Sequence, residues 1–148
     1  MQTNNQPKSR KKAVPLKEGL FTVPSPPGEG GHLIGSRCKS CGDVFFPKRD
    51  VCLSCGQADM EETALSTRGK LEAWTVVRQT PTGAIVTAPY GLGRIELPEG
   101  VFVATVLTDC DLEKLKSGTE WELVIEKVKE DEEGNDVMAY KFRPVQGL

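Results

Sequence analysis

Four cysteines in two CxxC pairs constrain the fold of this chain more than any other feature. Cys38 and Cys41 form the first pair, and Cys52 and Cys55 form the second after ten intervening residues. Two such turns can present four thiolates tetrahedrally, at about 2.3 Å from one zinc ion. A glycine follows each pair, where the backbone must turn its amides toward sulfur. The spacing predicts a metal-stapled ribbon over residues 32–56, with a rubredoxin-like iron site as the alternative.

A metal held by four protein ligands has no open position for water, so the predicted zinc stabilises structure and does not catalyse hydrolysis. Other catalytic groups are scarce. The single histidine, His32, follows a glycine-rich stretch and is interpreted as a solvated loop residue. Cys110 lies between two aspartates, which oppose thiolate formation, so we expect an inert thiol buried at a strand end. GxSxG, HExxH and Walker motifs are absent from the sequence, and we expect no catalysis by this chain alone.

The length of 148 residues suits one ordinary domain and a small appendage. No apolar run approaches the roughly 20 residues that span a bilayer, and no apolar stretch follows the basic residues near the N-terminus. We therefore expect a cytoplasmic protein without a membrane segment. Thiols in a reducing cytoplasm are metal ligands or catalytic groups more often than disulfides, which agrees with the metal interpretation.

Charge is distributed unevenly along the chain. Residues 1–56 hold nine Lys and Arg against four Asp and Glu, whereas residues 57–148 hold ten against seventeen. The halves therefore carry formal charges of +5 and −7. The first half could meet an anionic partner such as nucleic acid, a phosphate group or another protein, or it could be a solvated basic tail.

The segments that flank the ribbon are predicted to be irregular. Residues 1–31 contain five of the ten prolines and few large apolar side chains, which indicates an extended arm. Leu20 and Phe21 are its candidate anchors, on the surface of a partner. Residues 57–68 are polar and lack strand alternation, so they are interpreted as a linker.

From residue 69 onward the pattern is that of β-strands, and residues 69–148 are predicted to form one barrel domain. The fold class is mostly β: arm, rubredoxin-like zinc ribbon, then a five-stranded barrel of the OB-fold type with one short helix. An open five-stranded sandwich is the alternative. The first strand is expected to be buried on both faces, because both carry apolar groups. The expected strands cover residues 69–80, 90–97, 101–108, 121–129 and 137–142, with the helix at 111–118.

The ribbon carries an apolar trio, Phe45, Phe46 and Pro47, that could anchor an interface or simply pack against the barrel. A rival function is that of a module binding single-stranded nucleic acid, because such binders combine aromatic side chains with a positive groove. The acidic second half of the chain argues against it.

Several segments together resemble a known family. They are LIGSRCKSCG and VFFPKRDVCLSCG around the cysteines, the strand entry GKLEAWTVV, the pair Pro89–Tyr90, and the turn at residues 97–100. At this spacing they are similar to the rubredoxin-like zinc-ribbon/OB-fold proteins known as domain of unknown function 35, which occur beside acyl-CoA enzymes. The resemblance covers about residues 20–144.

The resemblance implies an accessory subunit in an obligate complex with a thiolase-superfamily enzyme. It implies that the ribbon docks on the catalytic subunit and that the barrel shapes the passage for the CoA chain. Within the family, the small subunit of the benzoylsuccinyl-CoA thiolase type is the working hypothesis. For acyl-CoA contacts the candidates are Arg78, Tyr90 and Arg94, with the loop at 80–90, because arginine forks suit phosphates. The arm departs from relatives that begin with an aromatic-rich helix, since prolines at 24, 26 and 27 oppose one.

Overall fold

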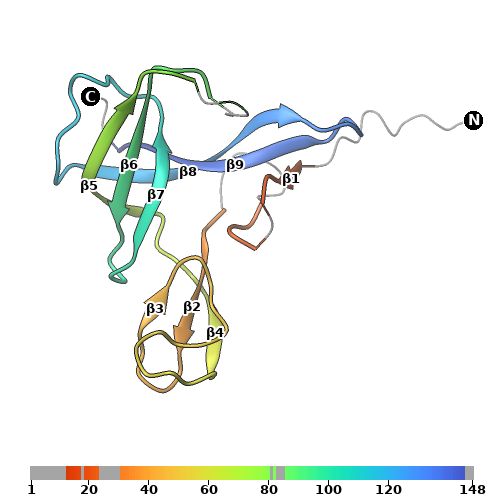
Figure 1. Ribbon diagram of the computed structural model, residues 1–148, viewed down its shortest axis with the longest axis vertical. Helices are drawn as coiled ribbons and strands as arrows, with labels where there is room; N and C mark the ends of the chain where they lie inside the picture. The colour runs from red at the N-terminus through yellow and green to blue at the C-terminus, as the bar shows by residue number, and fades with distance from the viewer. Residues whose placement is uncertain (1–12, 18, 24–30, 81, 83–85, 146–148) are drawn as a thin grey trace, which may run out of the picture.

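A computed structural model describes residues 13–17, 19–23, 31–80, 82 and 86–145 (Figure 1). It contains a six-stranded sheet, most of which closes into a barrel, and a three-stranded sheet that lies beyond one end of the barrel. Residues 1–12, 18 and 24–30 of the predicted arm lie outside the described residues, as do residues 81 and 83–85 of the loop at 80–90.

The three-stranded sheet is the ribbon. Strand β2 (Ile34–Cys38) lies between β3 (Val44–Phe45) and β4 (Met60–Ala64), and both pairings are antiparallel. A Cβ atom at Gly35 would lie 2.7 Å from the carbonyl oxygen of Phe45, so the close approach of β2 to β3 requires glycine at this position. The prediction of an irregular linker at residues 57–68 is corrected here. Strand β4 lies inside that segment because the backbone of β2 offers it a partner, which local polarity does not reveal.

The barrel confirms the mostly β fold class and the five strands predicted for it. Antiparallel pairings run through β5–β6, β6–β7, β5–β8 and β8–β9, and a parallel bridge between Leu107 and Phe142 closes β7 onto β9. The strands are β5 (Arg68–Val77), β6 (Tyr90–Glu96), β7 (Phe102–Leu107), β8 (Glu120–Glu130) and β9 (Asp136–Pro144).

The barrel interior is filled by side chains from every one of these strands. Burying a large apolar side chain stabilises a fold by about 1.5–3 kcal/mol, so this layer provides much of the driving force for closure. The indole Nε1 of Trp121 donates a hydrogen bond of 2.9 Å to Thr119 Oγ1, so its polar atom is satisfied. The fully buried members are Leu71, Ile95, Val103, Trp121 and Phe142.

The expectation that the first barrel strand is buried on both faces is wrong. A β-bulge between Leu71 and Ala73 shifts the register, so alternation along the sequence no longer reports the two faces. Leu71 is fully buried, but Trp74 is 39% exposed and Ala73 faces solvent.

The helix expected at residues 111–118 is also absent, and among the described residues the structure contains strands and turns only. The Asp111 carboxylate accepts the amide of Glu113 at 3.0 Å, as a helix-capping acid would. A helix does not form, because the amide of Gly118 donates to the carbonyl of Leu71 at 2.8 Å and this bond holds the segment against β5. Within the described part of the chain, no helix has the length and apolarity needed to cross a bilayer.

The arm packs on the same molecule. Strand β1 (Ala13–Pro15) adds to the edge of β9 in parallel, and Phe21 forms a bridge with Leu33 at the entry to the ribbon. Phe21 is 5% exposed, which confirms it as an anchor. The surface that receives it is this chain's own barrel and not a partner.

Candidate metal centre

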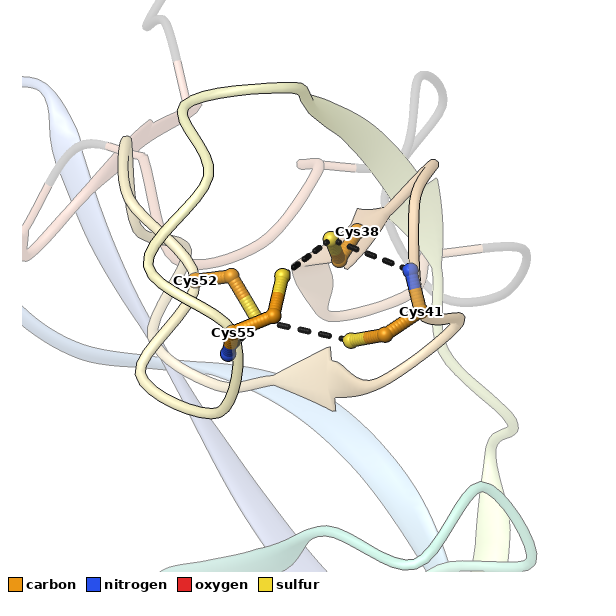
Figure 2. Close-up of side chains that lie close together, drawn as sticks. All are labelled: Cys38, Cys41, Cys52 and Cys55. Atoms are coloured by element: carbon orange, nitrogen blue, oxygen red, sulfur yellow. Dashed lines mark hydrogen bonds between the residues drawn. The ribbon is translucent and has the colours of Figure 1, made fainter.

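The two CxxC pairs form two similar turns that face each other across the ribbon (Figure 2). In the first, the amide of Gly42 donates to the carbonyl of Cys38 at 2.8 Å. In the second, the amide of Gly56 donates to the carbonyl of Cys52 at 2.9 Å. Both glycines have positive φ angles, 87° and 80°, a conformation that other residues adopt only with strain. The glycine after each cysteine pair therefore fixes the turn that points the sulfurs inward.

The four sulfur atoms converge to within 4.8 Å of one another. The Sγ atoms of Cys38 and Cys55 lie 3.6 Å apart, and those of Cys41 and Cys52 lie 3.5 Å apart. A tetrahedron with metal–sulfur bonds of about 2.3 Å has edges of about 3.8 Å. A disulfide requires about 2.05 Å. The arrangement therefore fits a tetrathiolate metal site and not a pair of disulfides.

Backbone amides prepare two of the sulfurs for the charged state. The amide of Cys41 points at Cys38 Sγ from 3.4 Å and lowers the pKa of that thiol. Burial raises the pKa of Cys52, but the amides of Cys55 and Ser54, at 3.4 and 3.3 Å, outweigh it and lower the pKa to about 6. These amides favour thiolate at the two buried members of the set.

The other two sulfurs show why a cation is needed. The amide of Asp43 lowers the pKa of Cys41, but the neighbouring sulfur of Cys52, burial and the sulfur of Cys38 together outweigh it and raise the pKa to about 12. The pKa of Cys55 is raised as well, against the effect of the Gln57 amide. Four thiolates this close repel one another, and a bound divalent cation compensates that repulsion. With all four ligands from the protein, such a metal has no open position for a substrate.

Arg94, one of the predicted CoA contacts, already has partners within the chain. It lies on the outer face of β6, where its Nε donates to Glu72 Oε1 at 2.6 Å and its guanidinium carbon lies 4.6 Å from the centre of the Phe102 ring. This hydrogen bond lowers the pKa of Glu72 and raises the pKa of Arg94, so both side chains stay charged.

The other two predicted contacts lie together near one end of the same hairpin. Tyr90 is half-buried and pairs with Val77, and Arg78 is exposed directly after that residue. Tyr90 and Arg94 share a face of β6, but four residues separate them. Arg78 and Tyr90 therefore form the tighter pair.

The two groups considered for catalysis have structural surroundings. His32 is half-buried, contrary to the expectation of a solvated loop residue, and its amide donates to Thr22 Oγ1 at 3.0 Å. The arm holds it because Phe21 and Leu33 are paired beside it. Cys110 is only partly buried, just beyond β7, and burial followed by the charges of Asp109 and Asp111 raises its pKa.

Tyr140 is a structural centre that sequence reasoning missed. Its ring makes edge-to-face contacts with Phe21 of the arm and Phe46 of the ribbon, at centroid distances of 6.1 and 6.0 Å. Its hydroxyl donates to the carbonyl of Ala104 at 2.9 Å. Phe46 therefore packs on the barrel, which favours the second of the two roles considered for the apolar trio. The alternation at 138, 140 and 142 identified a strand but could not show which segments would meet Tyr140.

Comparison with known proteins gives two adjacent family matches. Residues 29–61 match the rubredoxin-like zinc ribbon domain of ChsH2, and residues 62–126 match its C-terminal OB-fold domain. The boundary between them falls inside strand β4.

Two curated relatives and one solved structure match both the ribbon and the barrel. A DUF35 domain-containing scaffold protein of Pyrococcus furiosus is 43% identical over 115 residues, 77% of this chain and 84% of the relative. The benzoylsuccinyl-CoA thiolase subunit BbsA of Thauera aromatica is 30% identical over 142 residues, 96% of either chain. A solved structure described as an Ltp2-ChsH2(DUF35) aldolase has the same fold, with a TM-score of 0.66 at 24% identity over 78% of this chain and 86% of that one.

Proposed function

This chain belongs to the DUF35 family of zinc-ribbon and OB-fold proteins, and from that premise we propose that it is a non-catalytic subunit docked on a thiolase-superfamily enzyme. The observation that carries the proposal is the similarity to the thiolase subunit BbsA along almost the entire length of both chains. In this proposal Cys38, Cys41, Cys52 and Cys55 bind one structural zinc, and bond-making chemistry belongs to the other subunit.

The geometry of the chain agrees with a structural role. Four thiols around one metal leave no ligand position for a substrate. The imidazole Nδ1 of His32 lies 3.5 Å from Thr22 Oγ1, within the contact between the arm and the ribbon, and the raised pKa of Cys110 opposes thiolate formation at neutral pH.

Co-expression tests this function directly. The chain is produced together with the products of its neighbouring genes, a thiolase-like subunit that co-purifies with it is identified, and each subunit is also produced alone. We expect a stable complex by size-exclusion chromatography, with thiolysis of acyl-CoA, aromatic acyl-CoA included, by the complex and not by this chain alone. Turnover by the isolated chain, or failure of the two chains to associate, would refute the proposal.

Acyl-CoA contact is the finer part of the proposal. We expect Arg78 to contribute more than Arg94, because the guanidinium of Arg94 is bonded to Glu72 and stacked on Phe102. Arg78→Ala should weaken CoA binding by the assembled complex about tenfold, and Arg94→Ala less. Arg143→Ala, which removes a guanidinium paired with Glu122 on β8, is the matched control. Equal CoA affinity in all three variants and the parent would remove these arginines from the site.

Nucleic-acid binding is the second candidate. The exposed side chains of Trp74 and Phe102 favour it, since stacking on aromatics supports single-strand recognition. Binding of a single-stranded oligonucleotide at physiological ionic strength, weakening with added salt, would establish it. The formal charge of −7 on residues 57–148 predicts no such binding.

A further inference from the structure

An apolar groove crosses the outer surface of the barrel, away from the metal centre. The arm forms one wall, with Leu16 and Phe21, and strands β6, β7 and β9 form the floor, with Leu92, Val106 and Tyr140. Outer faces of a barrel that meet water are usually polar. The groove departs from that pattern.

The exposure of its side chains is unusual for a surface that stays in water. Leu16 and Leu92 are 42% and 40% exposed. Leu92 pairs with Val106 across the β6–β7 ladder, and both residues line the groove. Contiguous exposed apolar surface of this kind marks interaction sites.

The size of the groove argues against acyl-CoA as its occupant. Its volume is about 220 Å³. Pockets that enclose drug-sized ligands measure roughly 300–1,000 Å³. The space therefore suits one or two inserted side chains and not a cofactor-sized molecule.

The charge at the groove indicates what else the occupant carries. Among the described residues that line the groove, Lys17 is the one charged residue, and it is exposed. An occupant with a carboxylate next to its apolar side chain would meet Lys17, and such complementarity fixes orientation and partner choice.

The groove is also preformed. The Tyr140 ring is held against Phe21, and its hydroxyl is bonded to the carbonyl of Ala104 in the floor. A preformed surface loses little side-chain freedom on binding. The apolar trio of the ribbon offers less free apolar surface to a partner, because Phe46 is already packed on Tyr140 and Phe45 is half-buried.

We propose that this groove receives the catalytic subunit, through an apolar side chain of that subunit flanked by a carboxylate that pairs with Lys17. The inference rests on the proposed function and deepens it. It places the docking surface on the arm and the barrel, whereas family resemblance alone points to the ribbon.

The test compares groove variants with a ribbon variant in binding to the co-expressed catalytic subunit. Leu92→Thr keeps strand propensity while removing apolar surface, and it is combined with Leu16→Ser. Lys17→Glu reverses the rim charge. Leu53→Ser, at a ribbon side chain that is 64% exposed, is the matched control. Circular dichroism and zinc content check that each variant is folded.

We expect Leu16→Ser with Leu92→Thr to raise the Kd of the complex at least tenfold. Lys17→Glu should raise it severalfold and reduce its salt dependence, while Leu53→Ser changes it less than twofold. An unchanged Kd in the groove variants while the parent complex forms would overturn this inference and leave the proposed function intact. Absence of a parent complex would overturn both. A dimer of this chain alone that the groove variants dissociate would overturn the inference by making a second copy the occupant.

Discussion

Tyr140 connects parts of the chain that are distant in sequence. It contacts Phe21 of the arm and Phe46 of the ribbon, and it bonds to the backbone of β7 through Ala104. Each aromatic pair contributes about 0.5–1.5 kcal/mol beyond burial. Arm, ribbon and barrel are therefore oriented around one side chain.

Burial of this side chain gives a prediction for alkaline pH. Burial raises the pKa of Tyr140, because the phenolate would lose its hydration. Its contribution to stability is therefore complete below the unfolded pKa of about 10 and is lost as the pH rises through the higher folded pKa. In Tyr90→Phe, Tyr140 is the remaining tyrosine of two, so tyrosinate absorbance reports it alone. The midpoint should lie above 10 when folded and near 10 in urea, and equal midpoints would contradict the burial effect.

The cysteines provide a second prediction at this scale. Cys38→Ser removes a buried sulfur that accepts the amide of Cys41, so a structural metal loses both a ligand and its oriented turn. We expect elemental analysis to find about one zinc per parent chain and most of it lost from Cys38→Ser after dialysis. Cys110→Ser should retain its zinc in full, because that thiol lies outside the cluster. Equal zinc in both variants would show that the four-sulfur site is not the metal site.

At the level of the elements, β5 is the first barrel strand after the ribbon, and its backbone lies very close to β6 at Gly69. A Cβ atom at Gly69 would lie 2.5 Å from the carbonyl oxygen of Glu96 and 2.7 Å from Ile95 Cγ2. The bulge that follows Leu71 then turns the strand, so that Trp74 reaches the surface. Register in this strand depends on a glycine and an extra residue and not on apolar alternation.

This close approach makes Gly69→Ala a sharp test. The added methyl meets backbone that cannot move without disturbing the β5–β6 ladder, so we expect a loss of about 1–3 kcal/mol in the free energy of unfolding. Urea denaturation followed by tryptophan fluorescence measures it. Thr67→Ala, at an exposed side chain two residues earlier, should change stability by less than about 0.5 kcal/mol. Similar effects of the two substitutions would show that the approach is not tight.

At the scale of the whole molecule, the ribbon and the barrel are in direct contact. Their contacts include the Phe46–Tyr140 pair and the continuation of β4 into Leu65, which is buried in the main core. The ribbon's own sheet has three short strands and few buried apolar side chains, so metal binding, at about 10 kcal/mol or more, should dominate its stability.

Chelation should therefore unfold the ribbon and leave the barrel folded. Both tryptophans lie on barrel strands, so their fluorescence reports the barrel, while hydrogen exchange of amides 34–64 reports the ribbon. We expect loss of protection in the ribbon with tryptophan emission largely unchanged, and recovery when zinc is restored. Simultaneous loss of both signals at one chelator concentration would refute the predicted division into ribbon and barrel units.

The sequence by itself determined the features that depend on neighbouring residues. The metal centre follows from CxxCG turns, in which cysteine spacing and a glycine of positive φ are local properties. The barrel strands follow from alternation and turn chemistry, and each predicted strand is found within a few residues of its expected bounds.

Only the tertiary structure decided what depends on residues far apart along the chain. Strand β4 forms because β2 offers it a partner, and the turn at 111–118 is not a helix because Leu71 captures the amide of Gly118. The bulge in β5 reassigns the faces of the strand. The contact of Tyr140 with Phe21 and the apolar groove both arise where the arm crosses the barrel. Backbone and side-chain groups must all find partners, and the fold alone determines which partners come within reach.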